Sequence, residues 1–378
     1  MYYLSAGLKE IGLANLGKYL AIFFSICCIG GALGGGNMFQ ANQSFQQFLN
    51  ITGGDSSFFS DKAWLYGLIM ALLLGAVILG GIKSIAKVTE KLVPFMALIY
   101  VTASLIIIII NYNLIFDAFK LIIDGAFTGE GVAGGFVGVL IQGFRRAAFS
   151  NEAGLGSAPI AHAAARTDEP ADEGMVSILE PFIDTIVICT ITGLVILSSG
   201  VWMDKFENEF QRADMSFVSG TYTEADADDV ASLFSYLSGE ESTTRSYRGQ
   251  IELSNGVPQN NEAFTLIAAR SLAENSRYSR DGELISGTLN VVDGQLEDLS
   301  VVVTGDSLLH SVPLTTQAFT RGLFGQYGQY IVSIGLMLFA FSTAIAWSYY
   351  GDRAMTYPVS YTHLRAHETR HDVVCRLL

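Results

Sequence analysis

The sequence predicts an all-α polytopic membrane protein with a small extracytoplasmic α+β insert. Three observations lead to this fold class. The chain of 378 residues is 50% hydrophobic and 15% charged, with a mean hydropathy of +0.39, and this composition is typical of membrane proteins. Six stretches approach the roughly 20 apolar residues that a helix needs to cross a bilayer. The acidic residues behind the net charge of −14 concentrate in one polar block between the fifth and sixth stretches.

The six stretches predict six membrane spans, of which the fourth is interrupted by polar residues. In chain order the spans cover residues 20–36, 64–81, 93–110, 132–165, 176–200 and 327–349. The run Ile106–Ile110 is short enough to be a buried strand, but the apolar sequence around it favours a spanning helix. Residues 1–200 therefore hold five spans, and residues 320–357 hold the sixth.

Positively charged residues in short connections set the orientation of membrane spans, because such residues stay on the cytoplasmic side. They precede the first span, separate the second span from the third and follow the sixth. These residues are Lys9, Lys18, Lys83, Lys87, Lys91 and Arg353. The first, third and fifth spans are therefore expected to run outward. This orientation places residues 166–174 in the cytoplasm and the polar block outside.

The polar block, residues 201–319, holds 19 acidic and 7 basic residues, a balance of −12. Its patterns predict two helices, at 228–237 and 261–275, and two strands, at 284–292 and 299–303. The strands are separated by a turn signal, Asp293–Gly294. The simplest interpretation is a solvated lid or spacer. The alternative is a ligand-binding domain, which would make the protein a membrane-anchored sensor or binding protein.

The interruption of the fourth span is the strongest functional signal. Residues 149–159 read F-S-N-E-A-G-L-G-S-A-P, which brings a carboxylate, an amide, two hydroxyls, two glycines and a proline into an apolar region. Glycine and proline weaken a helix, and the Glu152 carboxylate is costly in hydrocarbon unless it is paired or faces water. Transporters place substrates and ions at such breaks. The alternative is a polar loop at the membrane surface.

Side-chain amides follow the glycine-rich end of the first span, which reads G-G-A-L-G-G-G-N-M-F-Q-A-N-Q over residues 30–43. Small residues allow close helix packing in lipid, and amides both donate and accept hydrogen bonds, as a zwitterionic ligand requires. Asn37 and Gln40 are therefore candidate binding residues, with Gln40 the better one. Hydrogen bonding between helices explains the amides equally well.

The fifth span carries two carboxylates on one helix face, since Glu180 and Asp184 are spaced i and i+4. Carboxylates inside a membrane are functional candidates. The alternative is a structural role, in which Glu180 lies at the cytoplasmic end of the span and only Asp184 is buried, paired with Arg145 or Arg146. For Glu180 we favour this alternative.

The sixth span carries adjacent hydroxyls, Ser342 and Thr343, and a tryptophan, Trp347. Sodium is a hard cation that prefers oxygen ligands, so the two hydroxyls are a candidate sodium site. The alternative is that both hydroxyls bond to the backbone of their own helix. Trp347 would wall an apolar substrate pocket.

Several classes of protein are disfavoured by what the sequence lacks. It contains no P-loop, no G-x-S-x-G elbow and no His/Cys metal set within the membrane spans, so an enzyme or an ATP-driven pump is not expected. It also contains no basic stripe with interleaved aromatic residues, so nucleic-acid binding is not expected.

Five segments together resemble the alanine or glycine:cation symporter family. They read G-N-M-F-Q-A-N-Q, G-G-I-K-S-I-A-K-V-T-E-K-L-V-P-F-M-A, F-S-N-E-A-G-L-G-S-A-P-I-A-H-A-A-A-R-T-D-E-P, E-P-F-I-D-T-I-V-I-C-T and F-S-T-A-I-A-W-S-Y-Y-G-D-R-A. The resemblance runs from Met1 to about Tyr357, except for the acidic insert. It implies a partial LeuT-type inverted-repeat fold, about helices 3 to 8 of 11, with the interrupted span as helix six.

The resemblance also implies sodium-coupled symport of alanine or glycine by alternating access across the plasma membrane, as in a bacterial inner membrane. Sodium would be a coupling ion and not a prosthetic group, and the partners would be the amino acid, sodium and the lipid bilayer. The expected substrate-binding residues are Asn37, Gln40, Phe149, Ser150, Asn151, Glu152, Gly154, Gly156 and Trp347. The expected sodium ligands are Ser342 and Thr343.

The two ends of the chain depart from the family pattern. By the resemblance, Met1 falls near the start of the family's third helix, so we expect this sequence not to include the broken first helix with its G-T-G-N motif. Residues 358–378 include V-S-Y-T-H-L-R-A-H-E-T-R-H-D, which resembles translated sequencing-adapter sequence. We therefore expect an internal fragment of a symporter with a non-native tail.

Overall fold

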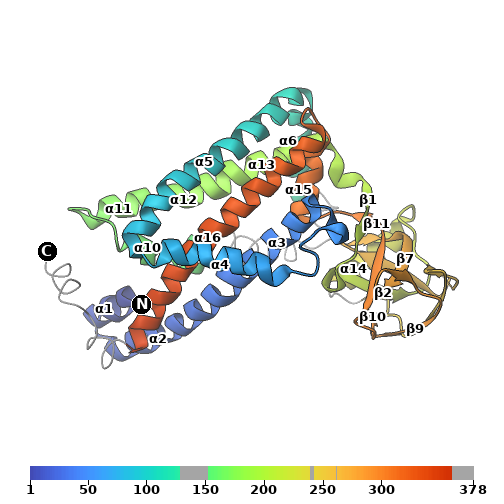
Figure 1. The fold of residues 1–378 in the computed structure, drawn as a ribbon, viewed down its shortest axis with the longest axis horizontal. Coiled ribbons are helices and arrows are strands. Elements are labelled where there is room, and N and C mark those ends of the chain that lie inside the picture. Colours follow the sequence, from blue (N-terminus) through green and yellow to red (C-terminus); the bar gives the residue numbers. More distant parts are fainter. Residues whose placement is uncertain (128–151, 239–241, 261, 360–378) are drawn as a thin grey trace. The chain divides into compact units, whose positions relative to one another are not determined.

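The computed structural model describes residues 1–127, 152–238, 242–260 and 262–359. The chain divides into two compact units (Figure 1). The first unit consists of residues 1–106, 147–191 and 326–378, and the second consists of 107–146 and 192–325. Helices α5 (Gly81–Ile110) and α13 (Cys189–Ser199) each begin in the first unit and end in the second.

The first unit is helical throughout its described part. Its elements up to α5 are α1 (Tyr2–Glu10), α2 (Ala14–Gly31), the π-helical segment η1 (Ala32–Phe39), α3 (Gln40–Ile51), the 3-10 turn η2 (Gly54–Ser56) and α4 (Ala63–Ile78). Its later elements are α9 (Glu152–Leu155), α10 (Ala158–His162), α11 (Pro170–Ser177), α12 (Leu179–Pro181), the π-helical segment η3 (Phe182–Ile188), the 3-10 turn η6 (Gly325–Tyr327), which lies at the unit boundary, and α16 (Gly328–Val359).

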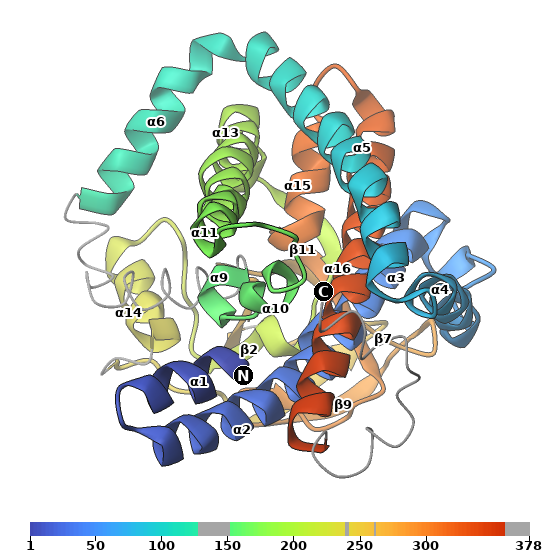
Figure 2. The same cartoon turned by 90° about the vertical axis from the view of Figure 1, so that its left-hand side faces the viewer.

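Two long helices form the centre of the first unit. Elements α2, η1 and α3 continue without a break as one helix of 38 residues, Ala14–Ile51, which is about 57 Å long at 1.5 Å per residue. This helix packs antiparallel along α16, as Figures 1 and 2 show. Ser25 Oγ donates to the Ala354 carbonyl at 2.5 Å, and Gln47 Nε2 donates to Ser333 Oγ at 2.7 Å. These contacts, near opposite ends of the pair, fix the antiparallel register.

Small residues allow this close approach. The buried stripe on the N-terminal helix consists of Ala21, Ser25, Cys28, Ala32 and Gly36, and the facing stripe on α16 includes Ala340, Ala344 and Ala354. Their spacing repeats every three or four residues, which keeps each stripe on one helix face. The glycine-rich end of the predicted first span is therefore a helix-packing surface.

Four of the six predicted spans coincide with helices that are long and apolar enough to cross a membrane. These helices are Ala14–Ile51, Gly81–Ile110, Ala171–Ser199 and Gly325–Pro358. The predicted second span is the shorter apolar helix α4, of 16 residues. Of the predicted fourth span, residues 132–151 lie outside the described residues.

The connection between the second and third spans differs from the prediction. Helix α5 begins at Gly81, so Lys83, Lys87 and Lys91 lie on its first turns and not in a loop. The orientation argument is unaffected, because it depends on the end of the span at which the lysines lie.

The second unit holds the acidic insert, whose strands form three antiparallel sheets. Its helical elements are α6 (Tyr112–Phe127), the 3-10 turns η4 (Val201–Met203) and η5 (Arg212–Asp214), α14 (Ala227–Ser238) and α15 (Ser311–Thr320). Its strands are β1 (Lys205–Glu209), β2 (Met215–Ser219), β3 (Gly249–Ser254), β4 (Val257–Pro258), β5 (Phe264–Ala268), β6 (Ser271–Leu272), β7 (Glu274–Arg280), β8 (Glu283–Leu284), β9 (Gly287–Val292), β10 (Gln295–Leu296) and β11 (Val301–Leu308).

The strand orders in the sheets are β1-β11-β7-β8, β10-β9-β3-β4 and β2-β5-β6. One apolar core joins them and includes Phe217, Ile251, Tyr278 and Val291, all nearly inaccessible to solvent. Burial raises the pKa of the Tyr278 hydroxyl. The predicted helix at 228–237 is confirmed as α14, whereas the predicted helix at 261–275 is wrong.

Residues 264–280 form β5, β6 and β7 in place of the predicted helix. The apolar residues of β5 are buried on both faces of the strand, and a short run of this kind is compatible with a helix or a strand by periodicity alone. The predicted turn at Asp293–Gly294 is confirmed, because both residues have positive φ, at 51° and 77°, between β9 and β10.

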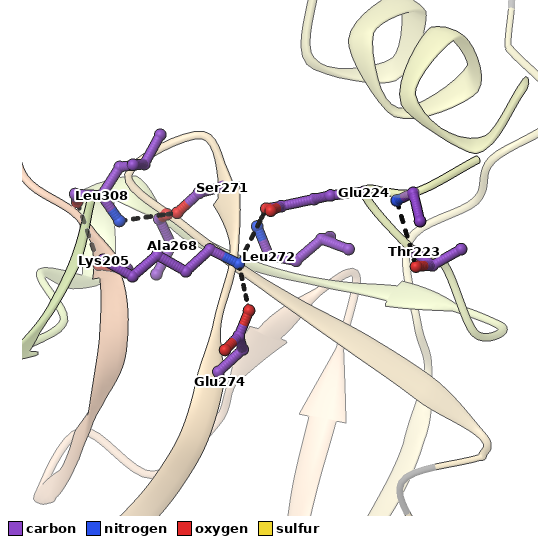
Figure 3. A network of polar contacts seen from close by, with 10 residues as sticks. Lys205, Thr223, Glu224, Ala268, Ser271, Leu272, Glu274 and Leu308 are labelled. Carbon is purple, nitrogen blue, oxygen red and sulfur yellow. Dashed lines mark hydrogen bonds and ion pairs between the residues drawn. The ribbon is translucent and has the colours of Figure 1, made fainter. Parts of the chain in front are cut away.

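Lys205, the first residue of β1, joins three parts of the insert (Figure 3). Its ammonium lies 2.5 Å from Glu274 on β7 and 3.0 Å from Glu224. Glu224 also accepts the Leu272 N–H at 3.0 Å. Partial burial alone would lower the pKa of Lys205, but the hydrogen bonds and charges of Glu274 and Glu224 outweigh it and raise that pKa. Lys205 therefore stays charged at neutral pH, and the network holds β6 and β7 against the start of the insert.

Candidate functional site

The two predicted amides lie where the first long helix changes its winding. Asn37 is within the π-helical segment η1, and Gln40 begins α3. Asn37 Nδ2 donates to the Ala32 carbonyl at 2.7 Å, and Gln40 Nε2 lies 3.5 Å from the Gly35 carbonyl. Each amide thus contacts the carbonyl five residues earlier. Single π-helical turns are common at functional sites. Here the amide side chains of Asn37 and Gln40 contact backbone carbonyls of the widened turn.

Asn37 is also linked to the sixth span. The Ser348 hydroxyl on α16 lies 3.2 Å from Asn37 Oδ1 and 2.7 Å from the Ala344 carbonyl, so one proton is shared between two acceptors. Asn37 therefore uses both ends of its amide, its nitrogen within η1 and its oxygen across to α16. Asn37 and Ser348 are both half-buried.

Trp347 packs on the glycines of the first long helix. A Cβ built on Gly36 would overlap the Trp347 side chain, and one built on Gly31 would lie 3.2 Å from its ring. The ring also meets Tyr350 edge to face, with centroids 5.6 Å apart. Asn37, Gly36, Trp347 and Ser348 therefore form one contact patch between η1 and α16, which we call the helix-crossing patch.

The predicted sodium ligands lie one turn before this patch on the same helix. Ser342 Oγ donates to the Phe339 carbonyl at 2.9 Å, as the structural alternative expected. Its oxygen lone pairs remain available, because the hydroxyl is the donor in that bond. Thr343 is half-buried at the next position. Among the residues that the structure describes, no group of three or more His, Cys, Asp or Glu residues is arranged to hold a metal ion.

The helix break falls at Gly156 and Ser157, between α9 and α10. Gly156 has a φ of +73°, which is the left-handed conformation that favours glycine. Ser157 is 1% exposed, and its hydroxyl oxygen has no hydrogen-bond partner among the described residues. An unsatisfied buried hydroxyl costs stability, so its place at the break is a functional signal.

Glu152, at the start of α9, lies in a cluster of polar groups. Its backbone N–H donates to Glu180 Oε1 at 3.2 Å, and its carboxylate lies near the Tyr350 hydroxyl. Glu180 was expected at the cytoplasmic end of its span, and its carboxylate lies against the backbone of the broken helix. Tyr350 ties the same helix to α16, three residues beyond Trp347.

Of the remaining predicted site residues, only Gly154 lies within the described part of the chain. Phe149, Ser150 and Asn151 lie outside the described residues, as do Arg145 and Arg146. Gly154 lies within the short helix α9. The structure thus brings Asn37 next to Trp347 through Ser348, the neighbouring residue on α16, and brings Glu152 directly against Glu180.

The structure adds three residues to the candidate site that were not selected from the sequence. These residues are Ser157, Ser348 and Tyr350. All three lie within the segments quoted for the family resemblance. A signal for Ser348 existed in its spacing from Ala344, since both fall on the face that carries the small-residue stripe.

Comparison with known families agrees with the membrane character of the chain. The model of the sodium:alanine symporter family matches residues 1–226 and 295–374. The segment between these ranges, residues 227–294, contains α14 and strands β3 to β9.

Curated relatives match about half of the chain. The sodium/alanine symporter AgcS of Methanococcus maripaludis is 44% identical over 202 residues, which cover 53% of this chain and 42% of the relative. In Bacillus subtilis, the probable sodium/glutamine symporter GlnT is 34% identical over 202 residues (53% and 39%), and the putative sodium/proton-dependent alanine carrier protein YrbD is 36% identical over 170 residues (45% and 34%). The matched part of the chain spans less than half of each relative.

Proposed function

Because the chain belongs to the sodium:alanine symporter family, we propose that it serves the sodium-coupled symport of a small neutral amino acid by alternating access. Membership of this family makes it a multi-pass plasma-membrane transporter protein and not an enzyme. The sensor alternative is not favoured, because an anchor for an external domain needs no broken or glycine-rich helix. In the proposed organisation, 1–200 and 320–357 form the transport part, with a partial LeuT-type fold, and 201–319 form an external domain.

The observation that carries the proposal is the helix-crossing patch. It brings the amide of Asn37 and the indole of Trp347, two predicted substrate-binding residues, into one patch from helices far apart in sequence. An amide that contacts a helix carbonyl in this structure exchanges that carbonyl for a ligand group at little cost, since one hydrogen bond replaces another. Asn37 and Gln40 would then bind the amino acid.

The break at Gly156 supplies the second half of the proposed site. Carbonyl groups next to a helix interruption can bind the ammonium of a substrate. The Ser157 hydroxyl, buried at the break, would add a side-chain hydrogen bond. Phe149 to Gly156 would contribute as well. The bulk of Trp347 would favour an alanine-sized side chain over glutamine on steric grounds.

Sodium, the co-substrate, would bind the oxygens of Ser342 and Thr343 on α16. The donor hydrogen of Ser342 already points to its own helix, so its oxygen presents lone pairs to a cation. Because the helix-crossing patch lies on the same helix, sodium binding and amino-acid binding would both depend on the position of α16. This shared dependence is a physical basis for coupling.

The test is uptake of labelled alanine into vesicles that contain a full-length family member with the same motif, with and without an inward sodium gradient. The proposal expects uptake that depends on the gradient. At the position of Gly156, a Gly156→Leu change should abolish uptake, because leucine is strained at a φ of +73° and fills the break. The matched control is Gly174→Leu, since a Cβ at exposed Gly174 meets nothing within 4 Å.

The outcomes separate the parts of the proposal. Unchanged uptake by the Gly156→Leu variant would exclude a substrate site at the break. Equal uptake with and without the sodium gradient would exclude sodium coupling. Size-exclusion profiles in detergent distinguish a variant that loses uptake because it is misfolded from a folded variant that loses uptake because its binding site is altered.

A further inference from the structure

Helix α6 carries its polar residues on one narrow face. These residues are Asn113, Asp117, Lys120 and Asp124, spaced i, i+4, i+7 and i+11. At about 100° per residue, the four fall within roughly 60° of the helix circumference. The rest of the circumference is apolar. Such a division is typical of helices that lie along a boundary between water and an apolar phase.

One apolar flank of α6 is open to solvent. Phe116, Phe119 and Ile123 lie three and four residues apart, and their side chains are 79%, 43% and 56% exposed. On the other flank, Leu114 and Leu121 are exposed to a similar extent, whereas the small residue Ala118 is buried. No described element makes an extensive contact with α6. An apolar row of this kind is unfavourable in water, so it indicates a contact surface.

The position of α6 in the chain indicates what covers this row. The candidate span Gly81–Ile110 ends one residue before α6 begins at Tyr112, and Figure 2 shows the chain turning between α5 and α6. A helix that follows a span so closely begins at the membrane surface. With 16 residues, α6 is about 24 Å long, shorter than the roughly 30 Å hydrocarbon core, and its charged face argues against a spanning position.

We propose that α6 lies along the extracytoplasmic interface between the bilayer and water. Phe116, Phe119 and Ile123 would lie among the lipid chains, and the charged face would lie in water. The charges on that face are two acidic and one basic, so the contact depends on apolar burial and not on attraction to anionic headgroups. The inference needs only the membrane location of the chain, and it stands or falls independently of the proposed transport site.

The test compares paired cysteine variants of the full chain in phosphatidylcholine vesicles. Phe116→Cys and Phe119→Cys probe the apolar flank, and Asp117→Cys and Lys120→Cys are matched controls one residue away on the polar face. Each carries a nitroxide spin label, and the unsubstituted chain, labelled identically, gives the background from its own cysteines. The measurement is spin relaxation by oxygen, which concentrates in lipid, and by a water-soluble nickel chelate.

The proposal expects the oxygen-to-nickel ratio to be several-fold higher at 116 and 119 than at 117 and 120. Adding anionic lipid should leave this difference unchanged. Equal nickel accessibility at all four positions would overturn the proposal, because the helix would then stand in water. Protection of 116 and 119 from both reagents would also overturn it, because another protein segment or a second copy would then cover the flank.

Discussion

At the scale of single residues, Gly36 sets how closely the two longest helices approach. The Trp347 side chain occupies the space that a Cβ at this position would need. The neighbouring Gly34 has no such neighbour, since a Cβ built there meets nothing within 4 Å. Comparing substitutions of Gly36 and Gly34 therefore distinguishes the need for space at the helix contact from the general destabilising effect of glycine in a helix.

We expect Gly36→Ala to destabilise the chain in detergent by about 1–3 kcal/mol, because the added methyl displaces Trp347. The control, Gly34→Ala, should have the opposite sign and stabilise by about 0.5–1 kcal/mol, since alanine is the better helix former. Thermal unfolding followed by size-exclusion chromatography measures both. If the two variants lose the same stability, Gly36 is not a packing position.

The Ser157 hydroxyl allows a similar comparison, because Ser104 on α5 is equally buried and also has no hydrogen-bond partner among the described residues. Only Ser157 lies at the helix break. Removing a buried hydroxyl that has no partner does not leave another group unsatisfied, so neither substitution by alanine should cost much stability.

In a full-length family member that carries both serines, Ser157→Ala should raise the KM for alanine severalfold and leave kcat and thermal stability close to the parent. Ser104→Ala should change none of the three. Transport kinetics in vesicles and thermal unfolding provide the readouts. An unchanged KM in the Ser157→Ala variant would assign that hydroxyl a purely structural role.

The residues of the candidate site were predictable from the sequence to a greater extent than their contacts. Polar groups inside apolar stretches stand out, and this signal selected Asn37 and Glu152. The Asn37–Ser348 contact was not predictable, because helical periodicity fixes a face but not the register of two helices far apart in sequence. The contact between Glu180 and the Glu152 N–H was not predictable for the same reason.

At the scale of elements, four hairpins of the insert use two-residue turns in which both residues have positive φ. These turns are Asn255–Gly256, Ala269–Arg270, Asp281–Gly282 and Asp293–Gly294. Three of them carry the Asn-Gly or Asp-Gly pair that this turn type favours. Ala269–Arg270 does not, so the β5–β6 hairpin gave no turn signal in the sequence. Its absence explains why a helix was predicted over residues that form strands.

Replacing this turn by the favoured pair should stabilise the insert. A left-handed conformation costs an ordinary residue about 1–2 kcal/mol, so the double variant Ala269→Asn, Arg270→Gly should gain up to about 2 kcal/mol. Hydrogen exchange of the β5 and β6 amides in the full chain measures the gain.

The matched control for the turn is Gly282→Ala in the β7–β8 hairpin. A Cβ at Gly282 meets nothing within 4 Å, so the φ of +83° alone determines the effect. This variant should lose about 1 kcal/mol. Faster exchange in the Ala269→Asn, Arg270→Gly variant would show that contacts of the native pair outweigh its backbone strain.

At the scale of the whole molecule, composition predicted the membrane character of the chain because hydropathy is a sum over many residues and tolerates local errors. The same reasoning missed α6, since an amphipathic helix has no long apolar run. The order in which the strands of the insert pair could also not be predicted from the sequence. Strand β1 pairs along its length with β11, and Lys205 lies opposite Leu308, so the chain enters and leaves the sheets through neighbouring strands.

This pairing predicts how the insert tolerates deletion. Replacing residues 205–308 by a short Gly/Ser linker should preserve membrane insertion and a monodisperse detergent profile, because the two ends already lie side by side. Deleting only 227–294, the segment outside the family match, should cause aggregation. It would leave β2 without β5 and β11 without β7. Equal aggregation of both variants would show that the insert is needed for folding of the helices.

The adjacent ends of β1 and β11 also have a practical consequence for imaging. Membrane proteins of this size give little signal outside the detergent belt, which limits particle alignment in electron microscopy. A rigid foreign module whose own termini lie one strand spacing apart, about 5 Å, could be grafted between Asp204 and Leu309 without a flexible tether. Such a chimera would carry a fixed landmark on one side of the bilayer.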